Sequence, residues 1–207
     1  MMYKSQTIVM ILSTFFLLVL QGCTGSKTIK KDKVLSHTSV HIQLTDGSTR
    51  EGIIVTSKND QLIFVDAASN RVDTLHYLVI SDMRESQNIY DFFGNKIPRS
   101  EIHNEKKFNN TLLYSGAGMF LGTAVGFGAF VAIVLTDSSK TTPATLTMAA
   151  CSIAGAVFFG KKGYNRDFQN AVENIRKRRY ELEKQKMIEE RQRLEELKKQ
   201  HDGSQKR

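Results

Sequence analysis

The residue best placed to do chemistry is Cys23, because its thiolate is a nucleophile that can accept a lipid group. It is preceded by three features typical of an export signal: a positive start at Lys4, an uncharged apolar core of 13 residues at positions 8–20, and the small Gly22. As a helix this core would span only about 20 Å, short of the ~30 Å hydrocarbon thickness of a bilayer. The pattern therefore predicts a cleaved signal rather than a permanent anchor.

The four residues Leu20-Gln21-Gly22-Cys23 resemble the lipobox of bacterial lipoproteins, in which an aliphatic residue and two further residues, the second of them small, precede an obligatory cysteine. The resemblance implies export, cleavage before Cys23 and attachment of acyl groups such as palmitate, which together anchor a protein stably. Thr24 stands where the enterobacterial sorting rule places aspartate for inner-membrane retention, so the outer membrane is slightly favoured over the inner membrane. The alternative is an ordinary signal peptide with a chance cysteine.

Composition restricts the partners of the exported chain. The full sequence has a formal net charge of +8 and a pI of about 9.5, values that fit nucleic acid, an anionic membrane or an acidic polymer as partners. Export makes nucleic acid the least favoured of these, so we expect membrane lipid as a partner and no nucleic acid. Two cysteines are present, Cys23 and Cys151, and lipidation of the first would leave no disulfide within the mature chain.

A β-patterned stretch covers residues 34–86. Val40, Ile42 and Leu44 alternate with polar residues, as in a half-buried strand, and Asp46-Gly47 is a strong hairpin signal. We expect five short strands, near residues 40–44, 49–56, 62–65, 72–78 and 79–84. Five short strands at close spacing predict a small antiparallel barrel.

Residues 40–47, Gly52 and residues 62–65 together resemble the opening of Sm-like and SH3-like small barrels. The resemblance implies the barrel fold alone. Sm-like proteins bind RNA through an asparagine before the third strand and a glycine-bearing motif near the fifth, whereas this chain has Leu62 and residues 80–82 (Ile-Ser-Asp) at those places. The whole layout also resembles poorly characterised bacterial lipoproteins that join such a barrel to a glycine-rich apolar hairpin.

Two uncharged apolar runs follow, at residues 112–135 and 144–160. As helices they would extend about 36 Å and about 26 Å, enough for one full and one marginal membrane span. Small residues recur every four positions in both runs and predict close helix packing, within one hairpin or between chains: Gly118, Gly122, Gly126, Ser152, Ala156 and Gly160. The alternatives are that glycine is merely common in transmembrane helices, or that the helices belong to a soluble core.

The residues that flank the two runs are basic: Arg99, Lys106, Lys107, Lys161, Lys162 and Arg166. The positive-inside rule would place both flanks in the cytoplasm, which conflicts with an exported N-terminus. We resolve the conflict by a hairpin that enters from the outer side with its flanks on anionic headgroups. Both ends of the hairpin then lie on one side of the membrane.

Residues 161–207 form a charged segment of high helix propensity without proline. Apolar residues such as Tyr180, Met187 and Leu194 recur every seven positions, but the register drifts, so any coiled coil is short or weak. The alternatives are a solvated helix, self-association, and adhesion to anionic headgroups through a basic cluster made of Arg176, Lys177, Arg178 and Arg179.

No catalytic or metal-binding pattern stands out in the sequence. His37 and His41 are four residues apart near the start of a strand, where this spacing does not converge on a metal. The glycines from Gly116 onward lack the preceding strand and the following lysine of a phosphate-binding loop. We therefore expect no catalytic residue, no metal and no cofactor.

These expectations combine into an α+β protein with a small antiparallel five-stranded barrel, a two-helix apolar hairpin and a long charged C-terminal helix. The expected segments are a signal peptide (1–22), a tether (23–33), the barrel (34–86), a polar and irregular linker (87–110), the hairpin (111–160) and the charged tail (161–207). Our leading hypothesis is a non-enzymatic, membrane-anchored envelope lipoprotein that acts as an adaptor or as a structural or oligomerisation module, with membrane lipid, an unknown envelope protein or a second copy as partners. The alternatives are a membrane-perturbing or pore-like assembly and, more weakly, an exported enzyme.

Overall fold

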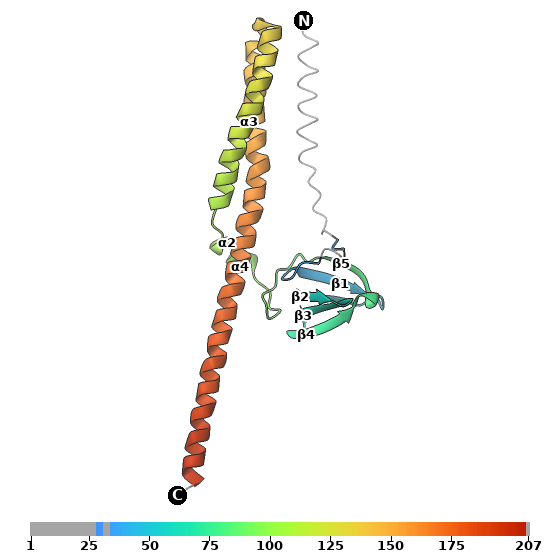
Figure 1. The fold of residues 1–207 in the computed structure, drawn as a ribbon, viewed down its shortest axis with the longest axis vertical. Coiled ribbons are helices and arrows are strands. Elements are labelled where there is room, and N and C mark those ends of the chain that lie inside the picture. Colours follow the sequence, from blue (N-terminus) through green and yellow to red (C-terminus); the bar gives the residue numbers. More distant parts are fainter. Residues whose placement is uncertain (1–27, 31–33, 206–207) are drawn as a thin grey trace.

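The computed structural model describes residues 28–30 and 34–205 and shows a chain of the α+β class (Figure 1). A five-stranded antiparallel sheet comes first, and the α-helices of the described residues follow it. The sheet domain lies beside the middle of the longest helix, α4, and helix α3 packs along the N-terminal part of α4 (Figure 1). The predicted order of a β domain, an apolar hairpin and a charged C-terminal helix is confirmed.

All five predicted strands are present, and neighbouring strands pair in the order β4-β3-β2-β1-β5. Their bounds are β1 (Ser39–Leu44), β2 (Thr49–Lys58), β3 (Gln61–Asp66), β4 (Arg71–His76) and β5 (Ile80–Glu85). The first turn forms as the sequence indicates, because Gly47 takes a φ of +85° and the Asp46 carboxylate accepts the backbone N–H of Ser48 at 2.8 Å. A 3-10 turn, η2 (Tyr77–Val79), separates the last two strands where a longer fourth strand was predicted.

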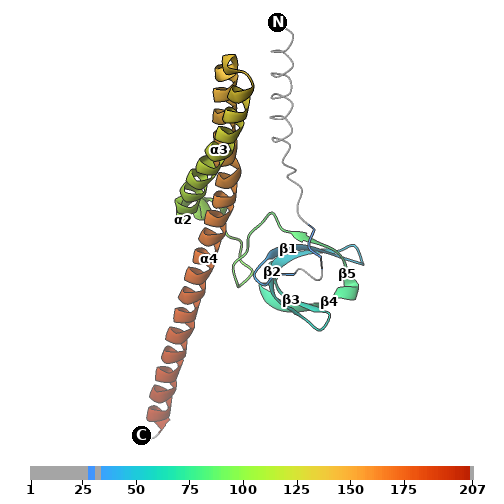
Figure 2. The ribbon, with the colours of Figure 1, turned by 45° about the horizontal axis from the view of Figure 1, so that its top comes forward.

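The sheet curves strongly around an apolar core (Figure 2). Its buried members are Val40, Ile42, Leu44, Ile54, Leu62, Phe64, Tyr77 and Met83. Gly52 permits β2 and β3 to approach closely, because a Cβ at this position would lie 2.0 Å from the carbonyl oxygen of Val65. The alternation in the sequence therefore places the apolar side chains on the inner face, as expected.

The chain enters the sheet domain at the β5 edge. Thr28 forms an antiparallel bridge with Arg84, and the backbone N–H of Ile29 donates to the Met83 carbonyl at 2.8 Å. Ile29 also packs against the core. Figure 1 shows β5 at the upper edge of the sheet domain, toward the end of the molecule at which the hairpin lies, and β4 at the lower edge.

The helices are α2 (Arg99–Glu105), α3 (Asn109–Thr136) and α4 (Thr141–Gln205), with a short 3-10 turn, η3 (Ser138–Lys140), between the last two. The prediction of an irregular linker was wrong at α2, whose Ile102 is buried against Ala171, Val172 and Ile175 of α4. Helix α4 has 65 residues, so it is about 97 Å long and runs without a break through the expected boundary at residues 160 and 161. The second helix of the apolar hairpin and the charged tail are therefore one continuous helix.

Candidate functional site

The glycines of α3 lie against the backbone of α4. A Cβ added at Gly118 would lie 2.3 Å from the carbonyl oxygen of Gly155, and one added at Gly122 would lie 2.3 Å from that of Cys151. At Gly126 the nearest atom of α4 would be 2.8 Å away. The two backbones approach this closely only because these positions have no side chain. The contacts lie within one chain and build an antiparallel hairpin.

The packing face of α4 differs in one respect from the predicted one. The Ser152 hydroxyl lies 2.8 Å from that of Thr123 on α3, and Gly160 is buried, whereas Ala156 is only half-buried. Gly155, which was not predicted, makes the closest contact, since its Cβ would lie 2.2 Å from the Gly118 carbonyl oxygen. In a helix with 3.6 residues per turn, residues spaced four apart drift around the helix by about 40° per step. A packing face must therefore include some spacings of three residues, as between Ser152 and Gly155. That drift could have been anticipated from the sequence.

The outer surface of the hairpin is apolar. The large side chains exposed on it include Leu112, Phe120, Phe127, Leu135, Val157 and Phe158. Each of the two helices contains a stretch that is long and apolar enough to cross a membrane. A contiguous apolar surface of this kind marks an interaction site for lipid or protein rather than for water.

Asp167 of α4 fixes the base of the hairpin. Its side chain is buried, and its carboxylate accepts the backbone N–H groups of Asn110 at 3.1 Å and Thr111 at 2.7 Å. The side chains of the same two residues also donate to it, each at 2.7 Å. These backbone groups are the unpaired donors of the first turn of α3, so one helix caps the other.

Arg176 joins α4 to the sheet domain. Its Nε donates to the Tyr90 carbonyl at 2.8 Å, its Nη1 donates to the His37 carbonyl at 2.8 Å, and its Nη2 donates to the Ser39 hydroxyl at 3.2 Å. The residue is buried, and burial lowers the pKa of its guanidinium to about 10, so it remains charged at neutral pH. Residues more than 130 positions apart are thus connected by one side chain.

The other members of the predicted basic cluster also have partners within the chain. Arg179 pairs with Asp91 at 2.8 Å and with Glu101 at 2.6 Å, and Arg178 pairs with Glu105 at 2.7 Å. Lys177 is well exposed and pairs only with Glu173 on its own helix. The three arginines therefore bind the linker and the sheet domain, and they are not a free basic surface.

Aromatic side chains complete this junction. Phe92 of the linker packs edge-on against His37, with ring centroids 4.8 Å apart, and also against Tyr180 of α4. Phe93 stacks on the other side of Tyr180, with centroids 6.2 Å apart. Together with the arginine contacts, these rings hold the sheet domain in a defined orientation on the helix.

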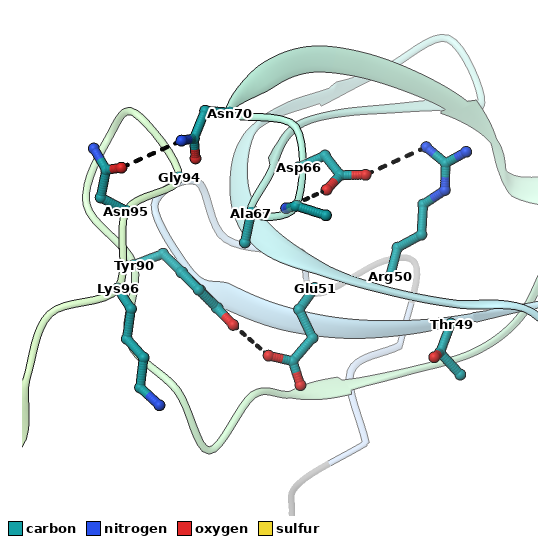
Figure 3. Close-up of a pocket in the computed structure, with 11 residues that line it drawn as sticks. Thr49, Arg50, Glu51, Asp66, Ala67, Asn70, Tyr90, Gly94, Asn95 and Lys96 are labelled. Atoms are coloured by element: carbon teal, nitrogen blue, oxygen red, sulfur yellow. Dashed lines mark hydrogen bonds and ion pairs between the residues drawn. The ribbon is translucent and has the colours of Figure 1, made fainter.

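A polar pocket of about 430 Å³ lies between β2, β3 and the linker (Figure 3). At its centre Glu51 accepts hydrogen bonds from the Tyr90 hydroxyl, from Asn88 at 3.0 Å and from His41 at 3.1 Å. Burial by itself would raise the pKa of Glu51, but these hydrogen bonds outweigh it and lower the pKa. Burial and the adjacent carboxylate raise the pKa of Tyr90 to about 12.

The charged groups of this pocket are used to hold the structure together. Arg50 pairs with Asp73 and, at 3.5 Å, with Asp66, while Glu51 accepts from Tyr90 and Asn88 of the linker. These contacts hold the sheet domain against the linker. Within residues 28–30 and 34–205 no group of three or more metal-ligating side chains converges on one point. His76 accepts the backbone N–H of Leu78, so it caps a turn.

No protein-family model, curated protein or solved structure matches this chain. The candidate lipidation site, Cys23, and the signal-like segment before it lie outside the residues that the structure describes. The functional elements that the structure does describe are the apolar hairpin and the junction that fixes the sheet domain to it.

Proposed function

We propose that this chain is a non-enzymatic, membrane-anchored envelope lipoprotein whose sheet domain is an adaptor held at a fixed distance from the bilayer. The observation that carries the proposal is the continuity of α4, which belongs to the apolar hairpin at one end and holds the buried Arg176 at the sheet domain. Arg176 is sixteen positions beyond Gly160, so about 24 Å of helix lies between the end of the apolar run and Arg176. A partner bound to the sheet domain would be positioned off the membrane surface.

The entry point of the chain supports a second attachment to the same membrane. Four residues lie between Cys23 and Thr28, the first described residue on the sheet, and the five steps from one to the other reach at most about 17 Å. This edge is the upper one of the sheet domain, toward the end of the molecule at which the hairpin lies (Figure 1). Acyl chains on Cys23 and the hairpin would then enter one membrane from one side, which is the topology that export requires.

The packing of the glycines favours the adaptor over a pore-like assembly. Gly118, Gly122 and Gly126 are covered by α4 of the same chain, so this face is not free for a neighbouring protomer. The curved sheet with its central apolar core supports closure as a small barrel of the Sm-like type, and such a barrel would be a binding module on the aqueous side (Figure 2). The charged groups of the pocket pair with one another and with the linker, which favours binding by the domain surface over catalysis.

Metabolic labelling with a palmitate analogue, combined with membrane fractionation, tests this proposal. Wild type should carry the label, and Cys23→Ala should lose it but remain in the membrane after alkaline carbonate washing, because the hairpin still holds it. Deletion of residues 109–163 in the Cys23→Ala background should release the protein. Label on Cys23→Ala would contradict lipidation at this residue, and release of Cys23→Ala by carbonate would contradict an inserted hairpin.

A further inference from the structure

Aromatic side chains surround the base of the hairpin, where its apolar surface ends. Phe108 and Tyr164 are 54% and 46% exposed, although most large rings of the sheet domain are buried. The Tyr114 hydroxyl, one turn into α3, accepts a hydrogen bond from Arg166 Nη1 at 2.7 Å. Rings with an apolar body and a polar end concentrate at the boundary between hydrocarbon and water.

Four cations share this level of the hairpin: Lys107, Lys161, Lys162 and Arg166. All four are exposed, and every ion pair in the described part of the chain involves other cations. The nearest carboxylate in sequence, Asp167, is buried and occupied by the first turn of α3. The base of the hairpin therefore carries positive charge that nothing in the described chain neutralises.

Lys106 has a different role from its neighbour Lys107. It is only 7% exposed, and its ammonium lies 4.4 Å from the centre of the Phe108 ring and 3.3 Å from that of Tyr164. This cation–π contact connects the corner between α2 and α3 to α4. It holds both rings at the same height, beside the exposed lysines.

We propose that these residues form a belt that binds the headgroups of anionic phospholipids and sets the depth of the hairpin. The belt consists of the rings of Phe108, Tyr114 and Tyr164 and the cations Lys107, Lys161, Lys162 and Arg166. The inference rests on the proposed insertion of the hairpin and names the lipid class that the insertion requires. A basic residue near an anionic surface raises binding about five-fold, so four such residues give a preference of roughly several hundred-fold at low salt.

The position of the belt selects lipid over a soluble anion. Lys161 and Lys162 directly follow the second apolar run, within the thickness of about 5–7 Å that headgroups occupy on each side of a bilayer. Arg166 lies about 9 Å along the helix from Gly160 and donates to Tyr114 of α3. The arginines at positions 176, 178 and 179 lie about 24 Å or more beyond Gly160 and are already paired. The belt thus replaces them as the basic surface that meets the membrane.

The test measures the lipid retained by the full-length chain purified from mixed micelles of phosphatidylcholine and phosphatidylglycerol. Wild type should retain phosphatidylglycerol in excess of its share, and sodium chloride at 0.5 M, a concentration that screens exposed charges, should reduce the excess. Lys161→Glu/Lys162→Glu should lose at least ten-fold of the preference. The matched control is Lys198→Glu/Lys199→Glu, which makes the same charge change on exposed lysines of the same helix, about 55 Å away. This control variant should retain the preference for phosphatidylglycerol.

Flotation with vesicles of pure phosphatidylcholine separates the two proposals. Failure of every variant to float would refute the inserted hairpin itself. Flotation of wild type with an equal retention of both lipids would refute the belt and leave the hairpin intact. If circular dichroism shows that the double glutamate variant has lost helix, Lys161→Gln/Lys162→Gln takes its place, with an expected loss of at least five-fold. Equal losses in the tail control would also overturn the assignment of the belt.

Discussion

Substitution of alanine for Gly122 is expected to loosen the hairpin, whereas the same substitution at Gly116 is not. The added Cβ at Gly122 would lie 2.3 Å from the Cys151 carbonyl oxygen and 3.0 Å from the Ser152 Cα, and both of these are backbone atoms that cannot turn away. At Gly116 no atom lies within 4 Å, so the matched variant changes helix propensity alone.

The size of the effect follows from the overlap. An ordinary contact needs at least 3.4 Å, so the helices must separate by about 1 Å, and overpacking of this kind costs about 1–3 kcal/mol. The open form of the hairpin should then become roughly 5- to 150-fold more populated. Gly116→Ala should be neutral or should stabilise α3 by up to about 1 kcal/mol.

Cys151 provides a native probe for this experiment, because its Cβ faces α3 and would lie 3.1 Å from a Cβ at Gly126. In a Cys23→Ala background it is the only cysteine, so the rate of maleimide alkylation in mild detergent reports hairpin opening. The rate should rise with Gly122→Ala and stay at the starting value with Gly116→Ala. Equal rates in the two variants would refute the close packing of α3 on α4.

Three further outcomes are expected. Arg176→Ala should lower the unfolding free energy of the sheet–helix junction by about 2–4 kcal/mol, because it leaves the Tyr90 carbonyl without its charged donor. Lys177→Ala should change this free energy by less than about 0.5 kcal/mol. Urea titration with limited proteolysis of the linker measures both changes. Hydrogen bonds lower the pKa of Glu51 in the folded state, so this residue contributes stability above its unfolded pKa. The contribution is lost as the pH falls through the lowered folded pKa. The urea midpoint should therefore fall more with acid in wild type than in Glu51→Gln, and an equal fall in both would contradict this. The pKa of Tyr90 is raised to about 12 in the folded state, so the stability that Tyr90 contributes is present below its unfolded pKa near 10 and is lost as the pH rises through about 12. Ultraviolet titration of phenolate absorbance, compared with Tyr90→Phe, should show this late ionisation.

Local patterns predicted the sheet well because each strand is defined by neighbours in the sequence. The alternation at Val40, Ile42 and Leu44 places these side chains in the core, and Asp46-Gly47 forms the expected turn. The strand ends were less predictable, since the 3-10 turn at Tyr77–Val79 depends on the His76 side chain accepting a backbone N–H.

The junction could not be predicted because its contacts join distant segments. In the sequence, Arg176 is indistinguishable from the other cations of a charged helix. Only the fold brings it into contact with His37, Ser39 and Tyr90. Helix α2 was missed for the same reason, since it is stabilised by the burial of Ile102 against α4 rather than by its own propensity. The hairpin itself could be predicted from the length and composition of its two apolar runs. The contact of Gly155 with Gly118 could not, because it depends on how the two helices are rotated relative to each other.

Lipidation at Cys23 is decided by the intact mass of the protein extracted from cell membranes. We predict a chain that begins at Cys23 and carries the added mass of a diacylglyceryl group, with or without a third acyl chain. A chain that retains Met1, carries no acyl mass and is recovered from the soluble fraction would contradict it.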